Sequence, residues 1–282
     1  MANTVATELM VDQIVLTGEV LARGRLAPLS AFVKDFSQKE IPANRNQLQE
    51  EQLSIVEGVA EVKTNPTSFN IAGTGDMKAR AITPSLYSAP LSNSRYNGFD
   101  QLRDWVTASM YKLSNAIMGA VGTAITTASF DEVKVDITNA RDVSTIDMLW
   151  RDLYASMTKG DRKYVIANTL LYSKSIQQNQ ITTPMGFDGI YECTQFNSGS
   201  SAGIITDGRG LAMVSRIPTW GDNSGGFINS TNVTLDDLGL TVQLNEWFDI
   251  DSRQDRASID VIFGCAAFDK TATKSITNGA GA

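Results

Sequence analysis

The chain of 282 residues contains no histidine and only two cysteines, Cys193 and Cys265. Without histidine it lacks the commonest general base, the commonest metal ligand and every catalytic arrangement that pairs histidine with serine or cysteine. Two cysteines are too few for a zinc cluster or a disulfide framework. We expect both to be reduced and buried, with one structural disulfide as the alternative. These absences exclude most familiar hydrolase and metalloenzyme sites.

Long hydrophobic runs are also missing, because no window of eighteen consecutive apolar residues occurs. The sequence therefore predicts no membrane span and no membrane partner. The first residues lack a basic region followed by an apolar one, so we expect no signal peptide. A net charge of −7 argues against tight binding to nucleic acid, which needs clustered Lys and Arg. With 42% hydrophobic residues, the chain can form one large or two ordinary domains around a substantial core.

The clearest positive signal is an amphipathic helix over residues 99–127, in which apolar residues recur every three or four positions. At ~1.5 Å per residue it would span roughly 43 Å. An average globular helix has only about 12 residues. Gly119 and Gly122 lie inside the apolar stripe and each costs about 1 kcal/mol relative to Ala, which disfavours a coiled coil. The pattern is typical of a helix that braces or crosses a large subunit.

Two segments before this helix carry apolar side chains without local partners. Residues 23–45 predict an extended arm that lies on a neighbouring subunit or on a distant part of its own chain. The arm's large apolar anchors are Leu26, Leu29, Phe32 and Phe36. Residues 52–97 predict a long two-stranded excursion around a turn-rich middle. An isolated hairpin is marginal in water, so the excursion needs a partner surface.

The remaining segments predict a mixed α+β fold. Residues 4–22 predict a short helix capped by Thr4, whose apolar positions include Leu16 and Val20. After the long helix we expect strands at 133–137, 163–168, 238–244 and 258–268, and helices at 144–157 and 169–179. The strand at 258–268 is apolar enough to be buried on both faces. Residues 207–210 (Asp-Gly-Arg-Gly) predict a hairpin turn.

Taken in this order, the parts resemble the major capsid protein of tailed bacteriophages, which has the HK97-like capsid fold. The resemblance is carried by the arm 26–37, the excursion ending at 86–92, the helix 99–127, the helix–strand–helix 144–179 and the strand 259–268. It implies an N-terminal arm (1–45) and an extended β-hairpin loop, or E-loop (46–97). It also implies a peripheral domain (98–142 and 257–282) with a spine helix at 99–127, and a mixed α/β axial domain (143–256).

The same resemblance implies a structural protein, not an enzyme, without catalytic residues, metal or cofactor. Such a protein self-assembles as pentamers and hexamers into an icosahedral shell around a phage genome. Its location would be the virion, after assembly in the host bacterial cytoplasm. The implied partners are a portal protein, a separate scaffolding protein, in some cases a decoration protein, and packaged double-stranded DNA, which it would contact loosely and without sequence preference.

Specific residues follow from these roles. We expect inter-subunit contacts at Leu26, Leu29, Phe32, Phe36, Phe69, Met77 and Tyr87. Some relatives join subunits by an isopeptide bond between a loop lysine and an asparagine, and Lys63 and Lys78 lie on the candidate loop. Two solvated lysines are the simpler interpretation, because that chemistry also needs a placed carboxylate and a placed asparagine. Deleting residues 1–36 should leave a soluble subunit that cannot close shells.

Three alternatives remain. An encapsulin, a nanocompartment shell of the same fold, would hold a cargo enzyme in place of a genome. An enzyme could use the acidic pairs Asp249/Asp251 or Asp236/Asp237 to hold a cation or act as acid and base, although acids beside turns are usually only solvated. A tail or adhesin structural protein would explain the sequons at Asn229 and Asn232, but only after export.

Overall fold

The computed structural model describes residues 4–42, 51–56, 77–91, 99–128, 130–139, 143–157, 162–177, 186–196, 201–219, 227–249, 251 and 254–279. Its helices are α1 (Thr4–Arg23), α2 (Phe99–Thr127), α3 (Val143–Ser156), α4 (Thr169–Gln177) and the short 3-10 helices η1 (Ala27–Ala31), η3 (Thr194–Phe196) and η4 (Lys270–Ala272). Its strands are β1 (Val33–Pro42), β2 (Glu51–Val56), β3 (Met77–Ile82), β4 (Ser85–Leu91), β5 (Asp131–Val135), β6 (Tyr164–Ala167), β7 (Gly189–Glu192), β8 (Ser201–Thr206), β9 (Leu211–Thr219), β10 (Phe227–Leu235), β11 (Leu240–Asp249), β12 (Gln254–Ala267) and β13 (Thr273–Asn278).

The larger, six-stranded sheet is built around β12. Its order is β1-β9-β12-β11-β10, and β4 pairs with the other edge of β12. The first half of β12 pairs with β11 and its second half with β9, so this long strand links both ends of the sheet. Residues 257–264 of β12 are all buried, which confirms the prediction of a strand covered on both faces.

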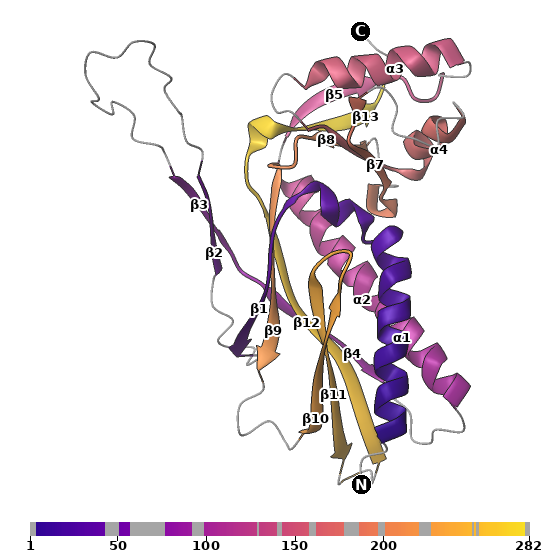
Figure 1. Cartoon of the computed structure of the whole chain (residues 1–282). Helices are drawn as coiled ribbons and strands as arrows, with labels where there is room; N and C mark the ends of the chain where they lie inside the picture. The colour runs from indigo at the N-terminus through magenta and orange to yellow at the C-terminus, as the bar shows by residue number, and fades with distance from the viewer. Residues whose placement is uncertain are drawn as a thin grey trace, which may run out of the picture.

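Helices α1 and α2 lie side by side against the larger sheet (Figure 1). The predicted 29-residue helix is confirmed at its predicted bounds, Phe99–Thr127. Its buried side chains recur at the helical period: Leu102, Val106, Met110, Leu113, Ile117, Val121 and Ile125. No helix in the described part of the chain is long and apolar enough to cross a membrane.

The smaller, five-stranded sheet has the order β5-β13-β8-β6-β7 and forms a second body together with α3 and α4 (Figure 1). Its separate core includes Trp150 of α3, which is fully buried and meets Phe187 edge to face with ring centroids 5.9 Å apart. The predicted helices and strands of residues 143–177 are confirmed within one or two residues.

The sheets divide the chain differently from the expected domain boundaries. Strands β9, β10 and β11, expected in the axial domain, belong to the larger sheet with β4 and β12. Strands β5 and β13, expected in the peripheral domain, belong to the smaller sheet with β6 and β8. The physical reason is that the chain crosses between the sheets at residues 206–211 and again at 267–273, so neighbours in sequence join different cores.

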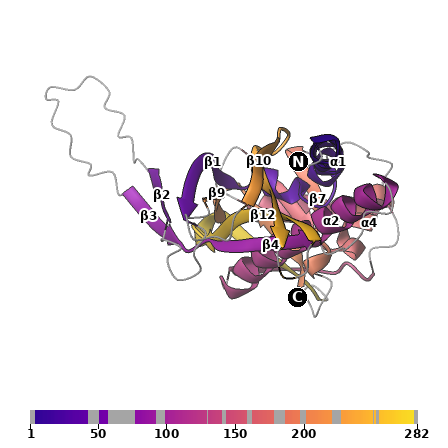
Figure 2. The ribbon, with the colours of Figure 1, turned by 90° about the horizontal axis from the view of Figure 1, so that it is seen from below.

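Strands β2 and β3 form a two-stranded antiparallel ribbon apart from both sheets. Their register runs from Glu51 paired with Ile82 to Val56 paired with Met77. Figures 1 and 2 show this ribbon projecting away from the body of the molecule. The predicted two-stranded excursion is confirmed over these residues; its predicted middle, residues 57–76, lies outside the described residues.

Candidate functional site: surfaces for assembly

The anchors of the expected arm are part of the subunit's own core. Leu26, Leu29 and Phe32 are 2%, 0% and 5% exposed and belong to the same apolar cluster as α1 and α2. The backbone holds them there: the Leu26 N–H donates to the Leu21 carbonyl at 2.8 Å, and β1 pairs with β9 in parallel. These three side chains therefore pack on a distant part of their own chain, the other placement that the sequence left open, and offer little surface to a neighbouring subunit.

Phe36 and Tyr87 also pack against this core, but both side chains are only partly buried. Phe36 packs edge to face on Phe263 at 6.2 Å, and the Lys34 ammonium lies 5.8 Å from its ring centroid. Burial raises the pKa of the Tyr87 hydroxyl, with a smaller contribution from Cys265. Both residues remain candidates for inter-subunit contact.

The other predicted contact and crosslink residues belong to β3 or, in sequence, to the segment between β2 and β3. Met77 and Lys78 are the first residues of β3 and pair with Val56 and Ile55 through the backbone. Phe69 and Lys63 lie outside the described residues. A ribbon of two strands buries too little apolar surface to be stable alone. It is therefore the part of the molecule that most needs a partner surface.

Helix α1 carries large apolar side chains that are exposed. The helix buries Met10, Ile14 and Leu21, whereas Leu16 and Val20, two apolar positions of the predicted helix, are 59% and 60% exposed. The sequence contains a pattern that separates the two sides of the helix. Met10, Ile14 and Leu21 are spaced four and seven residues apart and so share one side, which leaves Leu16 and Val20 on the opposite side.

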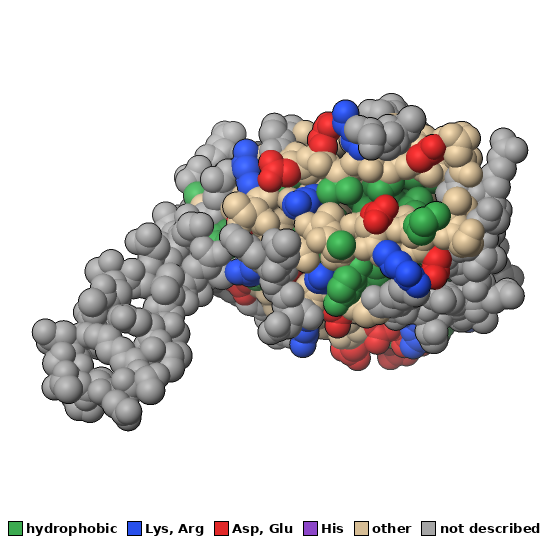
Figure 3. All heavy atoms as spheres, turned by 90° about the horizontal axis from the view of Figure 1, so that it is seen from above, with side chains coloured by type: hydrophobic (Ala, Val, Ile, Leu, Met, Phe, Trp, Pro, Cys, Tyr) green, Lys and Arg blue, Asp and Glu red, His purple; other side chains and the backbone are tan. Residues whose placement is uncertain are grey.

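Further exposed apolar side chains lie on the smaller-sheet body. They are Met148 and Tyr154 of α3 and Leu170 of α4, at 54%, 38% and 44% exposed. Figure 3 looks down on the end of the molecule that carries α3 and shows hydrophobic side chains among charged and polar ones. Apolar surface on both bodies suits a subunit that contacts neighbours on more than one side.

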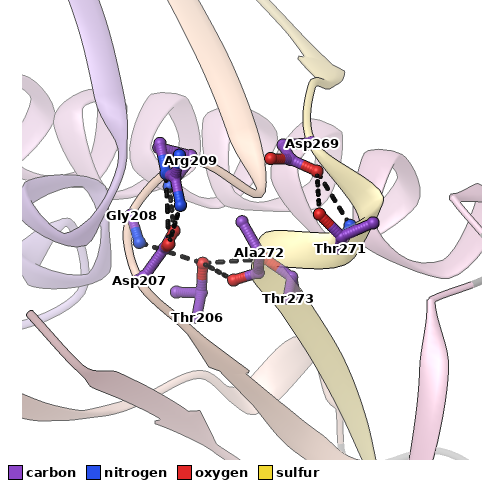
Figure 4. A network of polar contacts seen from close by, with 8 residues as sticks. All are labelled: Thr206, Asp207, Gly208, Arg209, Asp269, Thr271, Ala272 and Thr273. Atoms are coloured by element: carbon purple, nitrogen blue, oxygen red, sulfur yellow. Dashed lines mark hydrogen bonds and ion pairs between the residues drawn. The ribbon is translucent and has the colours of Figure 1, made fainter. Parts of the chain in front are cut away.

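The two crossings between the sheets meet in one polar cluster, which we call the inter-sheet clasp (Figure 4). Its members are Thr206, Asp207, Gly208, Arg209, Asp269, Thr271, Ala272 and Thr273. The Thr273 hydroxyl donates to the Thr206 hydroxyl at 2.8 Å, and Arg209 Nε donates to the Asp207 carboxylate at 3.1 Å. Residues 207–210 do form a turn, but the predicted hairpin is wrong, because β8 and β9 on either side belong to different sheets.

The acidic pairs proposed for an enzyme have structural partners. Asp249 pairs with Arg256 at 3.1 Å and accepts the Asp251 N–H at 3.1 Å. Asp237 pairs with Arg23 at 3.4 Å. Across the described ranges, no group of three or more acidic, cysteine or histidine residues could hold a metal ion. The prediction of two free cysteines is confirmed, and burial raises the pKa of the Cys265 thiol to about 12.

Comparison with known proteins shows which solved structures share this architecture. No family model matches the sequence, and no curated protein matches it. Among solved structures, a virus-like particle from Pyrococcus furiosus has a TM-score of 0.55 at 12% identity, with 93% of this chain and 96% of that chain covered. The capsid of a native GTA particle has a TM-score of 0.55 at 10% identity, with 91% of each chain covered. The mature capsid of bacteriophage PhiM1 has a TM-score of 0.52 at 8% identity, with 89% of each covered. The chain therefore has the HK97-like fold, that of the major capsid proteins of tailed bacteriophages.

Proposed function

We propose that this chain is a major capsid protein that self-assembles, as pentamers and hexamers, into an icosahedral shell around a phage genome. One observation carries the proposal: the likeness to capsid structures extends over about nine tenths of this chain and of theirs. A shared fold alone does not fix function. Two observations beyond the fold support the proposal: the likeness extends over most of the chain, and the chain carries a projecting two-stranded ribbon that is marginal without a partner surface.

The proposed assembly uses different surfaces on each subunit. Contacts of one surface with a different one generate rings and closed shells, whereas identical surfaces generate dimers. The β2–β3 ribbon would lie across the adjacent subunit, where each Å² of buried apolar area contributes ~25 cal/mol. The exposed apolar residues of α3 and α4 would meet their counterparts around the symmetry axes.

A nanocompartment shell of the encapsulin type is the second candidate. The likeness to a virus-like particle from Pyrococcus furiosus supports this second candidate, because that match covers 93% of this chain. Both candidates predict a closed particle, so particle formation alone does not separate them. The contents do: a capsid encloses nucleic acid, whereas a nanocompartment encloses a protein cargo.

The partners proposed for the capsid are a portal protein, a scaffolding protein and, in some cases, a decoration protein. Contact with packaged DNA would be loose, since a chain of net charge −7 is on balance repelled by a polyanion. We place the assembled protein in the virion and its assembly in the bacterial cytoplasm.

Electron microscopy of the full chain expressed alone, with light scattering for mass, tests the proposal. Uniform polyhedral particles of many copies are the expected result. If only small species form, the chain is co-expressed with a candidate scaffolding protein. A subunit that stays monomeric or dimeric under both conditions contradicts shell formation, and particles that contain one co-purified enzyme but no nucleic acid support the nanocompartment.

A further inference from the structure

The outward side of α1 carries an apolar strip, which consists of Val15, Leu16 and Val20. These side chains are 37%, 59% and 60% exposed, although they are aliphatic. The opposite side of the helix already supplies the core, through Met10 and Ile14 at 1% and 0% exposed. The strip therefore contributes little to folding, and its apolar surface is left for another molecule.

A shallow notch continues the strip toward the β10–β11 turn. It has a volume of about 40 Å³ and is lined by Val15, Gly18, Ala22 and Leu235, among others. Gly18 makes the close approach possible, because a Cβ at this position would lie 2.2 Å from Leu235 Cδ2. The notch is large enough for part of one aliphatic side chain and lies beside the strip.

Acidic residues border this apolar surface. Glu8, Asp12 and Glu19 are exposed on α1, and Asp236 and Asp237 lie in the adjacent turn. Of these five acids, Asp237 has an ion pair within the described part of the chain, with Arg23 at 3.4 Å. At about 100° per residue, Glu19 and Asp12 fall between Val15 and Leu16 around the helix, so the exposed face mixes apolar and acidic side chains.

We propose that the apolar strip and notch of α1 dock a cationic amphipathic helix from a second protein. The strip is a ridge on a helix of 20 residues, about 30 Å long, and such ridges pack into the grooves of another helix. Basic residues next to the partner's apolar ones would complement the acids on this face. A second copy of this chain that presented the same surface fits less well, because acidic residues would then face acidic residues.

Binding of a synthetic probe tests this docking on the full-length protein. The probe is a labelled amphipathic helix of about 20 residues, with leucines on one face and lysines beside them. Its twin has glutamate in place of each lysine. Fluorescence anisotropy should detect the lysine peptide, with affinity that falls as salt rises, and should detect no binding of the glutamate twin.

Two variants and a matched control locate the site. The double variant Leu16→Gln with Val20→Gln should weaken binding at least about tenfold. Glu19→Lys should weaken it and reduce its salt dependence. Met148→Gln, which changes an equally exposed apolar residue on α3, should bind the peptide as the wild type does. Circular dichroism on each variant checks that the fold is intact.

Three results would overturn the inference. These are equal binding of both peptides, lysine-peptide binding that the double variant retains, and loss of self-association in the double variant without peptide binding. The last would assign the surface to a second copy of this chain. Because peptide binding is read on the subunit and shell formation by microscopy, this inference and the proposed function can fail independently.

Discussion

Gly210 lies directly against Thr273 in the inter-sheet clasp. A Cβ at residue 210 would stand 1.7 Å from Thr273 Oγ1 and 3.0 Å from Thr206 Oγ1. The Gly210 carbonyl accepts the Phe268 N–H at 2.9 Å, which binds one crossing of the chain to the other. The close approach of the two crossings, and so the placement of one sheet on the other, requires a residue without a side chain.

Gly210→Ala should therefore destabilise the protein. The new methyl group would have to displace the buried Thr273 side chain and break its hydrogen bond to Thr206, with an expected loss of about 1–3 kcal/mol in the free energy of unfolding. Urea unfolding measures this. Gly119→Ala is the matched control, since nothing lies within 4 Å of a Cβ at that position. It should raise the free energy of unfolding by up to about 1 kcal/mol, because Ala has the higher helix propensity. Equal midpoints for Gly210→Ala and wild type would contradict the role of the clasp.

Asp260, in the middle of β12, predicts a pH-dependent stability. It is 0% exposed, and its Oδ2 accepts hydrogen bonds from Asn245 Nδ2 at 2.7 Å and from Ser258 Oγ at 2.9 Å. Burial raises the pKa of this carboxyl, and hydrogen bonds, including one from Ser88, offset part of the rise. The folded pKa thus lies above the unfolded value of about 3.9. Folding therefore favours the protonated carboxyl of Asp260. The stability that this preference contributes is fully present below the unfolded pKa and is lost as pH rises through the folded pKa.

Asp260→Asn removes this titration while it keeps the shape and one acceptor oxygen. The free energy of unfolding of the wild type should fall relative to that of the variant as pH rises above about 4. Denaturant unfolding of both proteins over a series of pH values is the measurement. Parallel curves for the two proteins would show that the folded and unfolded states bind this proton equally.

Elements with strong internal periodicity could be predicted from the sequence. Helix α2 was predicted at its observed bounds, and α3 and β12 within a few residues, because their apolar spacing is set by the element itself. The resemblance of the ordered parts to a capsid protein led to the fold, although no single motif carries it. Local spacing and the order of elements were sufficient for this level of description.

What the sequence could not supply was the partner of each apolar residue. Leu29 and Phe32 look like anchors for a neighbour, yet the pairing of β1 with β9, almost 180 residues later, carries them into their own core. The turn at residues 207–210 has the composition of a hairpin, and only the tertiary structure separates β8 from β9. For α1 the apolar positions Leu16 and Val20 could be named from the sequence, but helix spacing alone does not say that they face away from the core.

The buried side of α1 predicts that the N-terminal segment is needed for folding. Deleting residues 1–36 should give an unfolded or aggregated chain, in contrast to the soluble subunit expected from the sequence, because the deletion removes Met10, Ile14, Leu21 and Leu29 from the core. A sharper test compares two neighbours. Ile14→Ala should lose about 2–5 kcal/mol in urea unfolding. Leu16→Gln, at a side chain 59% exposed, should change stability little. If the variant that lacks residues 1–36 were soluble and unfolded cooperatively, α1 would not be needed for folding.

The loop lysines predict a simple result on a denaturing gel. We expect particles to dissolve into single chains, because an isopeptide bond needs Lys63 or Lys78 beside both a carboxylate and an asparagine of a neighbour. Lys63→Ala and Lys78→Ala should leave the pattern unchanged. A ladder of covalent multimers that either substitution abolishes would instead identify the crosslinking lysine.

The β2–β3 ribbon predicts a separation of folding from assembly. Glu51 and Ile82 are register partners, so residues 52–81 can be replaced by an Asn-Gly turn that joins the two strand ends directly. The excision spares Ile82, which is 1% exposed and packs with Ala212 and Val214 of β9. The shortened chain should therefore melt cooperatively near the wild-type temperature.

The same shortened chain should form no closed particles, because the ribbon pairs with no further strand in the described part of the subunit and so has its contact area on a neighbour. Thermal melting followed by circular dichroism measures whether the shortened chain folds, and electron microscopy measures whether it forms particles. Normal particles from a well-folded excision variant would remove the ribbon from the assembly contacts. The apolar surfaces of α3 and α4 would then have to supply the whole of the subunit association, which Met148→Gln and Leu170→Gln would weaken directly.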